Sequence, residues 1–397
     1  MIKLNLKFSD KFKEEYFEYC YNEIISDKID EIRMSLPDNE NSLFYFNALF
    51  NKCSIREILF CPAEDLEKII ETFFKLFPVL AERYHYSYLL NKVSIPRNCM
   101  ELSLQDEEQK SHFDSIVDNT ILELEKLTKE YDLVVTQSHI NDLRQSTISR
   151  YNKKKVLCRL ENAKRGNSIL TRKYIDMFPL WVNSLETVFD YNIMAKKYGY
   201  DLACNADTSI CAYCGLENIQ TYNNEQIQVR PELDHFYPKS RFPFLALSLF
   251  NLIPVGLVCN QRHKRNTPMI GYMHPSLDSL QNNTFFTFSF LDGSDVQETL
   301  KVGVAPQHNF KDNNISLFKI QALYEGSEEL RYWYSCLHHI SEFHKSNGDD
   351  LSAIDFTAVT WRHTIRLDAP ATKVSAQQFK VDAINDLFGT YLCSFEQ

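Results

Sequence analysis

Glycine is scarce in this sequence, with only ten among 397 residues, and no two glycines lie closer than ten positions apart. Phosphate-binding loops of the GxxxxGK and GxGxxG types need closely spaced glycines, which let the backbone approach a phosphate. Both loops are therefore excluded. We expect any step driven by nucleotide hydrolysis to come from a partner protein.

Long apolar runs are also lacking, since no stretch approaches the roughly 18–20 apolar residues that a transmembrane helix needs. The N-terminus, MIKLNLKFSDKFKEEYFEYC, becomes charged before a signal-peptide core could form. These features predict a cytoplasmic protein without membrane contact. The eleven cysteines are an odd number and lie mostly singly, so a disulfide framework is not expected.

Basic residues are outnumbered by acidic ones, 43 to 53, which taken alone argues against nucleic-acid binding. The charge is unevenly distributed, however. Residues 1–143 carry 16 basic and 27 acidic residues, and residues 174–397 carry 17 and 25, whereas residues 144–173 carry ten basic residues and one acidic residue. We call residues 144–173 the basic island. A charge run is usually a solvated face, but the near absence of compensating acids favours contact with nucleic-acid phosphates. The candidate contacts in the island are Lys153, Lys154, Lys155, Arg159, Lys164 and Arg165.

The spacing of apolar residues predicts a mainly α fold with a small α+β part. Helices are expected over 11–33, 64–90, 114–131, 314–346 and 374–395. The segment FFTFSFLDGSDVQETLKVGV predicts a β-hairpin around Asp292-Gly293. The expected organisation is an acidic α-helical domain at 1–143, a basic helical connector at 144–200, a small module at 201–280, and a β-hairpin plus helical C-terminal region at 281–397.

The most informative stretch is CAYCGLENIQTYNNEQIQVRPELDHFYPKSRFPFLALSLFNLIPVGLVCNQRHKRN, residues 211–266. Asp234 and His235 end an expected strand, Asn251 opens a second strand (NLIPV), and Asn260 lies in a short polar helix. A strand–loop–strand–helix unit can bring Asp234, His235 and Asn260 to one cleft. Carboxylate and amide oxygens suit a hard cation such as Mg²⁺. A neutral imidazole beside that cation could take a proton from an attacking water.

The pattern LDHFYPKS…NLIPV…CN resembles the HNH family of ββα-metal endonucleases over about fifty-five residues. The resemblance implies that 201–280 is an HNH nuclease module in which Asp234 and Asn260 hold Mg²⁺ or another divalent cation. It implies that His235 is the general base and that Asn251 braces the loop presenting it. His263 shares a helix face with Asn260 and is a further catalytic candidate. Lys264 and Lys239 are candidate phosphate contacts beside the site.

Many HNH proteins fasten this unit with two CxxC pairs around a structural zinc ion. Cys211 and Cys214 form the first pair, but in GLVC the residue Gly256 replaces one expected ligand and only Cys259 remains. Because structural zinc is nearly always four-coordinate, a fourth ligand is needed. His263 or Cys204 could supply it. Alternatively, the zinc has been lost and the cysteines simply pack.

The segments FDYNIMAKKYGYDLA…CAYC and LDHFYPKS look like those of the nuclease subunit of Septu-type and retron-associated bacterial anti-phage defence systems. The resemblance covers roughly residues 180–330, and residues 1–143 match no such subunit. It implies an ABC-type ATPase as a partner. The function expected is metal-dependent hydrolysis of phosphodiester bonds in DNA. Two alternatives stay open: an RNA or tRNA endonuclease using the same site, and a non-catalytic, zinc-stabilised nucleic-acid-binding adaptor.

Overall fold

The computed structural model describes most of the chain, with short gaps. The described residues are 2–36, 40–95, 97, 99–167, 170–279, 285–305, 311–356, 358, 361, 365–367 and 369–392. The chain is 59% helix and 6% strand, which confirms the mainly α class with a small β part. Among the described residues, no helix is both long enough and apolar enough to cross a bilayer.

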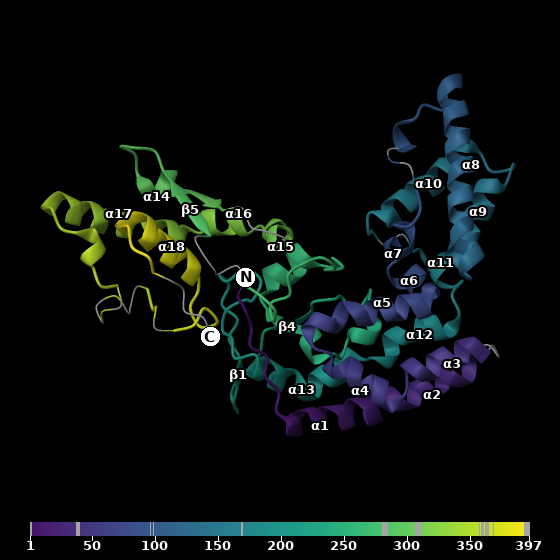
Figure 1. Ribbon diagram of the computed structural model, residues 1–397, viewed down its shortest axis with the longest axis horizontal. Helices are drawn as coiled ribbons and strands as arrows, with labels where there is room; N and C mark the ends of the chain where they lie inside the picture. Colours follow the sequence, from purple (N-terminus) through teal and green to yellow (C-terminus); the bar gives the residue numbers. More distant parts are fainter. Residues whose placement is uncertain are drawn as a thin grey trace.

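The N-terminal helices and two later helices form the base of the molecule in Figure 1. A helix was expected over 11–33, and the chain there is helical throughout, with a six-residue π-helical segment between two α-helices. The side chain of Ser9 accepts a hydrogen bond from the Phe12 amide and thereby caps the first helix. The elements of the base are α1 (Asp10–Tyr19), η1 (Cys20–Ile25), α2 (Ser26–Ser35), α3 (Glu40–Leu49), α4 (Lys52–Phe60), η2 (Ala63–Asp65), α5 (Leu66–Leu76), α12 (Leu180–Val188) and α13 (Tyr191–Asn205).

A second group of helices projects from the base as an arm, to the right in Figure 1. The basic island supplies α10, which packs against α7 and α9 of the preceding region. The packing therefore crosses the predicted boundary at 143/144, and α10 is part of the arm. The elements of the arm are α6 (Pro78–Tyr84), α7 (Ser87–Leu90), η3 (Cys99–Glu101), α8 (Glu107–Glu130), α9 (Val134–Arg144), α10 (Arg150–Lys164) and α11 (Arg172–Ile175).

The described part of the centre contains two small antiparallel strand pairs and three short helices. In the pair β3–β4, Asp234 lies opposite Ile253 and His235 opposite Leu252. The expected order of strand, loop, strand and helix is observed, and the helix η6 is a π-helix. The elements are β1 (Tyr222–Asn223), β2 (Gln228–Val229), β3 (Glu232–His235), η4 (Pro243–Leu245), η5 (Leu249–Asn251), β4 (Leu252–Val255) and η6 (Val258–Lys264).

The C-terminal region forms a second arm. Its strands β5 and β6 pair antiparallel, as expected, with Phe286 opposite Val304. Asp292 and Gly293 lie in the connection between the two strands, as expected, and this connection also includes the short helix α14. The elements are β5 (Phe286–Ser289), α14 (Val296–Thr299), β6 (Lys301–Val304), α15 (Lys311–Leu317), α16 (Ile320–Glu325), α17 (Glu328–Asn347), η7 (Leu351–Ala353) and α18 (Gln377–Phe388).

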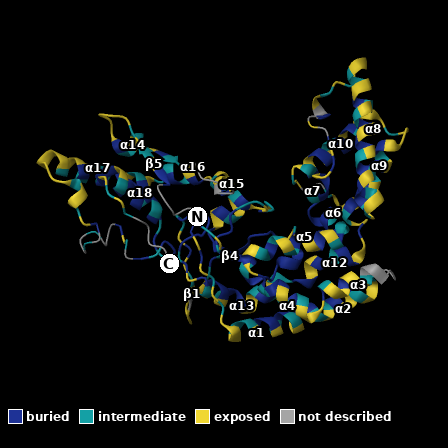
Figure 2. Cartoon of the chain, in the orientation of Figure 1, coloured by how far each residue is buried: buried dark blue, intermediate teal, exposed yellow. Residues whose placement is uncertain are grey.

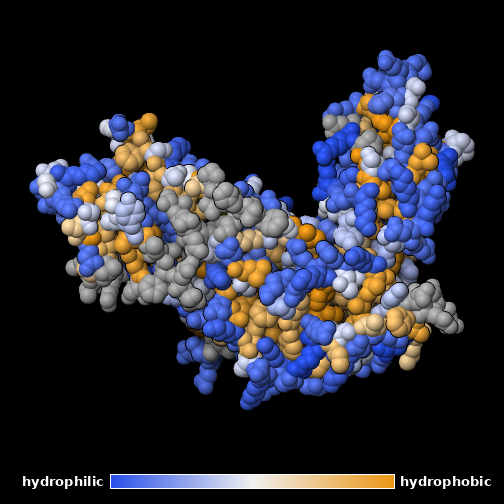
Figure 3. Space-filling view, in the orientation of Figure 1, coloured by the Kyte–Doolittle hydropathy of each residue, from blue (hydrophilic) through white to orange (hydrophobic). Residues whose placement is uncertain are grey.

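One apolar core extends through the base, the centre and both arms, from Leu4 to Phe388. Figure 2 shows this buried interior along the helices of the base and of both arms, and Figure 3 shows the surface hollowed between the two arms. The base directly supports the loop between β3 and β4. The ring of Phe73 stacks on that of Phe244 with centroids 4.0 Å apart. The Tyr16 hydroxyl donates to the Leu247 carbonyl at 2.7 Å.

Candidate metal centre and the Asp234–His235 site

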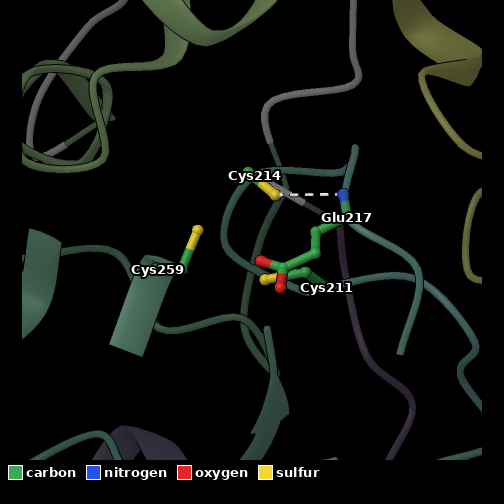
Figure 4. Close-up of side chains that lie close together, drawn as sticks. All are labelled: Cys211, Cys214, Glu217 and Cys259. Atoms are coloured by element: carbon green, nitrogen blue, oxygen red, sulfur yellow. Dashed lines mark hydrogen bonds between the residues drawn. The ribbon is translucent and has the colours of Figure 1, made fainter. Parts of the chain in front are cut away.

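Three cysteines and one glutamate converge in the centre of the molecule. Cys211, Cys214 and Glu217 lie on the loop before β1, and Cys259 lies on η6. Their ligand atoms all lie within 4.8 Å of one another, and Figure 4 shows the side chains facing a common point. Three thiolates and a carboxylate form a donor set of the kind that binds zinc with four ligands. This cluster could hold a metal ion such as zinc.

The fourth member of the cluster is Glu217, which sequence reasoning missed. The residue expected to be cysteine is Gly256, and a Cβ atom there would lie 1.9 Å from Oε2 of Glu217. The glutamate therefore occupies space that only glycine leaves free. Its other oxygen, Oε1, accepts a hydrogen bond from the Leu257 amide at 3.1 Å. The two residues predicted as alternative fourth ligands, His263 and Cys204, lie outside the cluster.

The thiols of the cluster have different proton affinities. The Sγ atom of Cys214 accepts hydrogen bonds from the Leu216 and Glu217 amides, both at 3.4 Å. Hydrogen bonds from the neighbouring thiols of Cys211 and Cys259, together with these amides, lower the pKa of Cys214 well below its ordinary value. Burial raises the pKa of Cys211, and hydrogen bonds to the other two thiols raise that of Cys259. A bound cation would favour the thiolate form of all three cysteines.

Asp234 lies in the interior beside this cluster. The Tyr213 hydroxyl donates to its Oδ2 atom at 2.6 Å, and Tyr213 stands between the two cysteines of the CxxC pair. The ammonium of Lys264 lies 3.1 Å from Oδ1 and also 3.1 Å from Oδ2. Burial raises the pKa of the Asp234 carboxyl, while Lys264 and Tyr213 counteract this effect. The carboxylate is thus held by two buried donors.

His235 follows on the same strand and has a defined proton position. Its Nε2 atom lies 3.0 Å from the Ala246 carbonyl oxygen, which can only accept, so in the neutral ring the proton is on Nε2. The Nδ1 atom then carries the lone pair. Burial lowers the pKa of His235 to about 3, so the ring is neutral at pH 7. The Tyr191 ring packs edge-on against it, with centroids 4.5 Å apart.

Asn251 holds both ends of the loop that follows His235. Its side-chain oxygen accepts from the Tyr237 amide at 2.7 Å, and its side-chain nitrogen donates to the Tyr237 and Leu245 carbonyls at 3.1 and 3.0 Å. Asn251 is fully buried, so these groups have no access to solvent. The side chain therefore fixes the backbone just after the histidine and just before Ala246, to which the histidine is bonded.

Asn260 contacts a carboxylate, but this carboxylate is Glu232. The Nδ2 atom of Asn260 donates to Glu232 Oε2 at 2.8 Å, and the neighbouring Gln261 donates to Oε1 at 2.6 Å. Glu232 is two residues before Asp234, so both side chains lie on one face of β3. This two-residue spacing was the signal that could have identified Glu232 from the sequence. Asn260 therefore contacts Glu232, whereas the oxygens of Asp234 accept from Tyr213 and Lys264.

The remaining candidates near the site differ in exposure. Lys239 is exposed, with its ammonium 5.0 Å from the centre of the Tyr191 ring. His263 is half-buried on η6. Lys264 was expected to contact a phosphate, but it is buried and forms an ion pair with Asp234. A phosphate contact does not fit this position, since the ammonium faces the protein interior.

Several residues of the basic island have partners within the arm. Lys154 and Lys164 donate to the carbonyls of Leu102 and Val93, each at 2.6 Å, and Arg165 pairs with Glu161. Lys154 and Lys164 fasten α10 to neighbouring loops, whereas the Arg165–Glu161 pair lies at the end of α10 itself. Of the other candidates, Lys155 and Arg159 are exposed, and Lys153 is half-buried. In Figure 1, α10 lies in the arm and β4 in the centre, so the island and the site belong to different parts of the molecule.

We compared the chain with protein-family models, with curated proteins and with solved structures, and none of these matches it.

Proposed function

We propose that this protein is a metal-dependent endonuclease of the HNH type that hydrolyses phosphodiester bonds in DNA. The observation that supports the proposal most is the arrangement at the end of β3. There, Asp234 and His235 are consecutive residues, and Asn251 clamps the loop that orients the imidazole. Bracing of this loop is the role that the resemblance assigns to Asn251.

The chemistry follows from the protonation state of the histidine. Since Nε2 donates to Ala246, the Nδ1 atom of His235 is free to accept a proton from the attacking water. A divalent cation held by Asp234 and Asn260, with Glu232 beside them, would stabilise charge developing on the phosphate and the leaving oxygen. Zinc in the Cys211–Cys214–Glu217–Cys259 cluster would hold η6, which carries Asn260, against the preceding loop.

The expected substrate contact is with the phosphate backbone, because charge neutralisation by basic side chains does not depend on base sequence. Lys239 beside the site and the exposed residues of α10 are the described side chains that suit this role. The net charge of −10 disfavours binding elsewhere on the surface. Because these contacts are with the phosphate backbone, we expect cleavage to depend little on base sequence.

The defence role and the ATPase partner are part of the same proposal and rest on the sequence resemblance. The absence of a glycine-rich nucleotide loop supports a division of labour in which a second protein hydrolyses ATP. Co-expression with a candidate ABC-type ATPase, followed by co-purification, tests this part. A chain that purifies alone would contradict it.

The test of the activity is cleavage of plasmid DNA in the presence of Mg²⁺ by the wild type and by His235→Ala. We expect the variant to lose at least about a hundredfold in rate, as is typical when a general base is removed. His112→Ala is a matched control, since His112 is exposed on α8. Full activity of His235→Ala would overturn the assignment of the base. Parallel reactions with tRNA distinguish DNA from RNA cleavage, and binding without cleavage of either would favour the adaptor alternative.

A further inference from the structure

Lys264 is the most deeply buried cation near the Asp234–His235 site. Its side chain is 1% exposed, and its Nζ atom lies 3.1 Å from each carboxylate oxygen of Asp234. The same ammonium donates to the His235 carbonyl at 2.7 Å. It therefore faces the carboxylate between its two oxygens, which is a position that a bound metal ion would need.

The carboxylate of Asp234 has little room for a further ligand. Tyr213 already donates to Oδ2, and the carboxylate is almost fully enclosed by protein. A divalent cation and an ammonium cannot share this carboxylate at close range, because two like charges in a buried site repel strongly. A metal ion can therefore reach Asp234 only if Lys264 leaves.

The backbone around Lys264 is of a kind that can rearrange. Lys264 is the last residue of η6, a π-helix, and the next residue, Arg265, has a left-handed backbone with φ of 50°. Both features are less favourable than an ordinary α-helix ending, and such strain is often found where a protein switches between states. A change of η6 from π- to α-helical winding would rotate Lys264 relative to Asn260 and withdraw the ammonium from Asp234.

We propose that Lys264 is an internal competitor for the catalytic cation: its ammonium occupies the metal position of Asp234 and keeps the site metal-free until η6 rearranges. This inference rests on the proposed function, because it concerns the same Asp234 site. A divalent cation such as Mg²⁺ or Mn²⁺ is the ligand that replaces the ammonium. This contact alone would then hold the Asp234 site in a silent state.

The first test is Mn²⁺ binding to the full chain, measured by electron paramagnetic resonance and by calorimetry, with the cysteine cluster kept loaded with zinc. Lys264→Met should bind Mn²⁺ at least about tenfold more tightly than the wild type, which corresponds to about 1.4 kcal/mol. Lys264→Arg keeps the charge and should show no gain. The double variant Asp234→Asn/Lys264→Met should lose the gain. Equal Mn²⁺ affinity in the wild type and Lys264→Met would overturn the proposal.

A second measurement uses the wild type and so does not depend on the folding of a variant. An amine-acylating reagent followed by mass spectrometry reports how accessible Lys264 is. We expect its acylation to rise several-fold when Mn²⁺ is raised to saturation, while acylation of exposed Lys239 stays constant. Saturation with Mn²⁺ and no change in Lys264 acylation would contradict the displacement.

The two proposals fail in different ways. If Lys264→Met gains Mn²⁺ affinity through Asp234 but cleaves no nucleic acid, the displacement stands and the nuclease function falls. If the wild type cleaves DNA with Mn²⁺ and binds the ion as tightly as Lys264→Met, the nuclease function stands and the displacement falls.

Discussion

Tyr213 links the Cys211–Cys214–Glu217–Cys259 cluster to Asp234 in the centre of the molecule. It lies between Cys211 and Cys214 in the sequence, and its hydroxyl donates to Asp234. Its ring is fully buried and stacks on Phe318, with centroids 4.4 Å apart. The loop that carries the cysteines therefore also fixes the carboxylate of the proposed active site.

Replacing Tyr213 by phenylalanine tests this link. Tyr213→Phe removes a donor to a buried carboxylate, and we expect unfolding free energy to fall by about 1.5–3 kcal/mol, the usual range for a hydrogen bond to a charged group. Tyr324→Phe is the matched control, since Tyr324 is also buried and donates to the neutral Cys214 carbonyl at 2.9 Å. Its expected loss is about 1 kcal/mol. Urea denaturation measures both, and equal losses would show that the charge of Asp234 does not contribute.

Gly256 has no side chain and so leaves the space that the Glu217 carboxylate occupies. Glu217→Ala should weaken zinc binding at least about tenfold, because a four-coordinate site loses a ligand. Adding Gly256→Cys to that variant should restore tight binding by completing a four-cysteine set. Competition with a chromophoric chelator measures the affinities. Unchanged zinc affinity in Glu217→Ala would show that the carboxylate only caps η6 through the Leu257 amide.

The cysteines could be predicted from the sequence and the glutamate could not, for a physical reason. The spacing of Cys211 and Cys214, and their position ahead of Cys259, are local patterns. Glu217 lies in a polar segment where an exposed acid is ordinary, and its place in the cluster depends on the fold bringing that segment over Gly256. A glycine where a ligand is expected, with a carboxylate shortly after the CxxC pair, is the signal to seek in other chains.

Among the secondary-structure elements, the strand pair β3–β4 was predictable from the sequence, whereas the contacts of α10 were not. The expected positions of His235 and Asn251 agree with the observed pairing, because strand signals and turn residues bound this unit in the sequence. The partners of Lys154 and Lys164 are carbonyls 52 and 71 residues earlier in the chain. Contacts between residues so far apart leave no local pattern in the sequence. A run of basic residues that fastens a helix therefore looks the same in the sequence as a run that binds nucleic acid.

Arg241 connects the arm to the loop between β3 and β4. Its guanidinium donates to the Asn266 carbonyl at 2.8 Å and also to the Gly166 carbonyl, just after α10. Asn266 is two residues beyond Lys264. The side chain of Arg241 thus joins the backbone just after α10 to the segment that follows η6. A displacement of the arm would therefore be transmitted to the helix that carries Lys264.

Over the whole molecule, buried titratable groups set how stability depends on pH. Burial lowers the pKa of four histidines, to about 4 for two of them and to about 3 for the others: His85, His139, His235 and His274. Burial raises the pKa of Glu82 to about 7 and of Asp382 to about 6. Of these six groups, between about pH 6 and 5 the unfolded chain carries protons on the four histidines, whereas the folded chain carries them on the two carboxyls. The unfolded state therefore binds about two more protons, and acid destabilises the fold.

We expect unfolding free energy to fall by about 2–3 kcal/mol between pH 6 and pH 5, since each proton contributes roughly 1.4 kcal/mol per pH unit. His139→Met should roughly halve this change. His139 is fully buried, and neither of its ring nitrogens has a hydrogen-bond partner in the described structure, so it enters the fold as the neutral form. Urea denaturation at the two pH values measures the difference. His112→Ala should leave the slope as in the wild type, and a slope unaffected by His139→Met would contradict the assignment.

The supports of the site come from widely separated parts of the chain, and this has a consequence for its synthesis on the ribosome. The Leu247 carbonyl is bonded to Tyr16, and the Gly215 carbonyl accepts from the Ala376 amide at 2.8 Å, beside the cysteine loop. A nascent chain that has emerged only as far as η6 has the residues of the site but lacks the segment that closes over the cysteine loop. The cysteine loop is therefore closed only after Ala376 has emerged, so chains terminated before this residue should lack a fully closed cysteine loop.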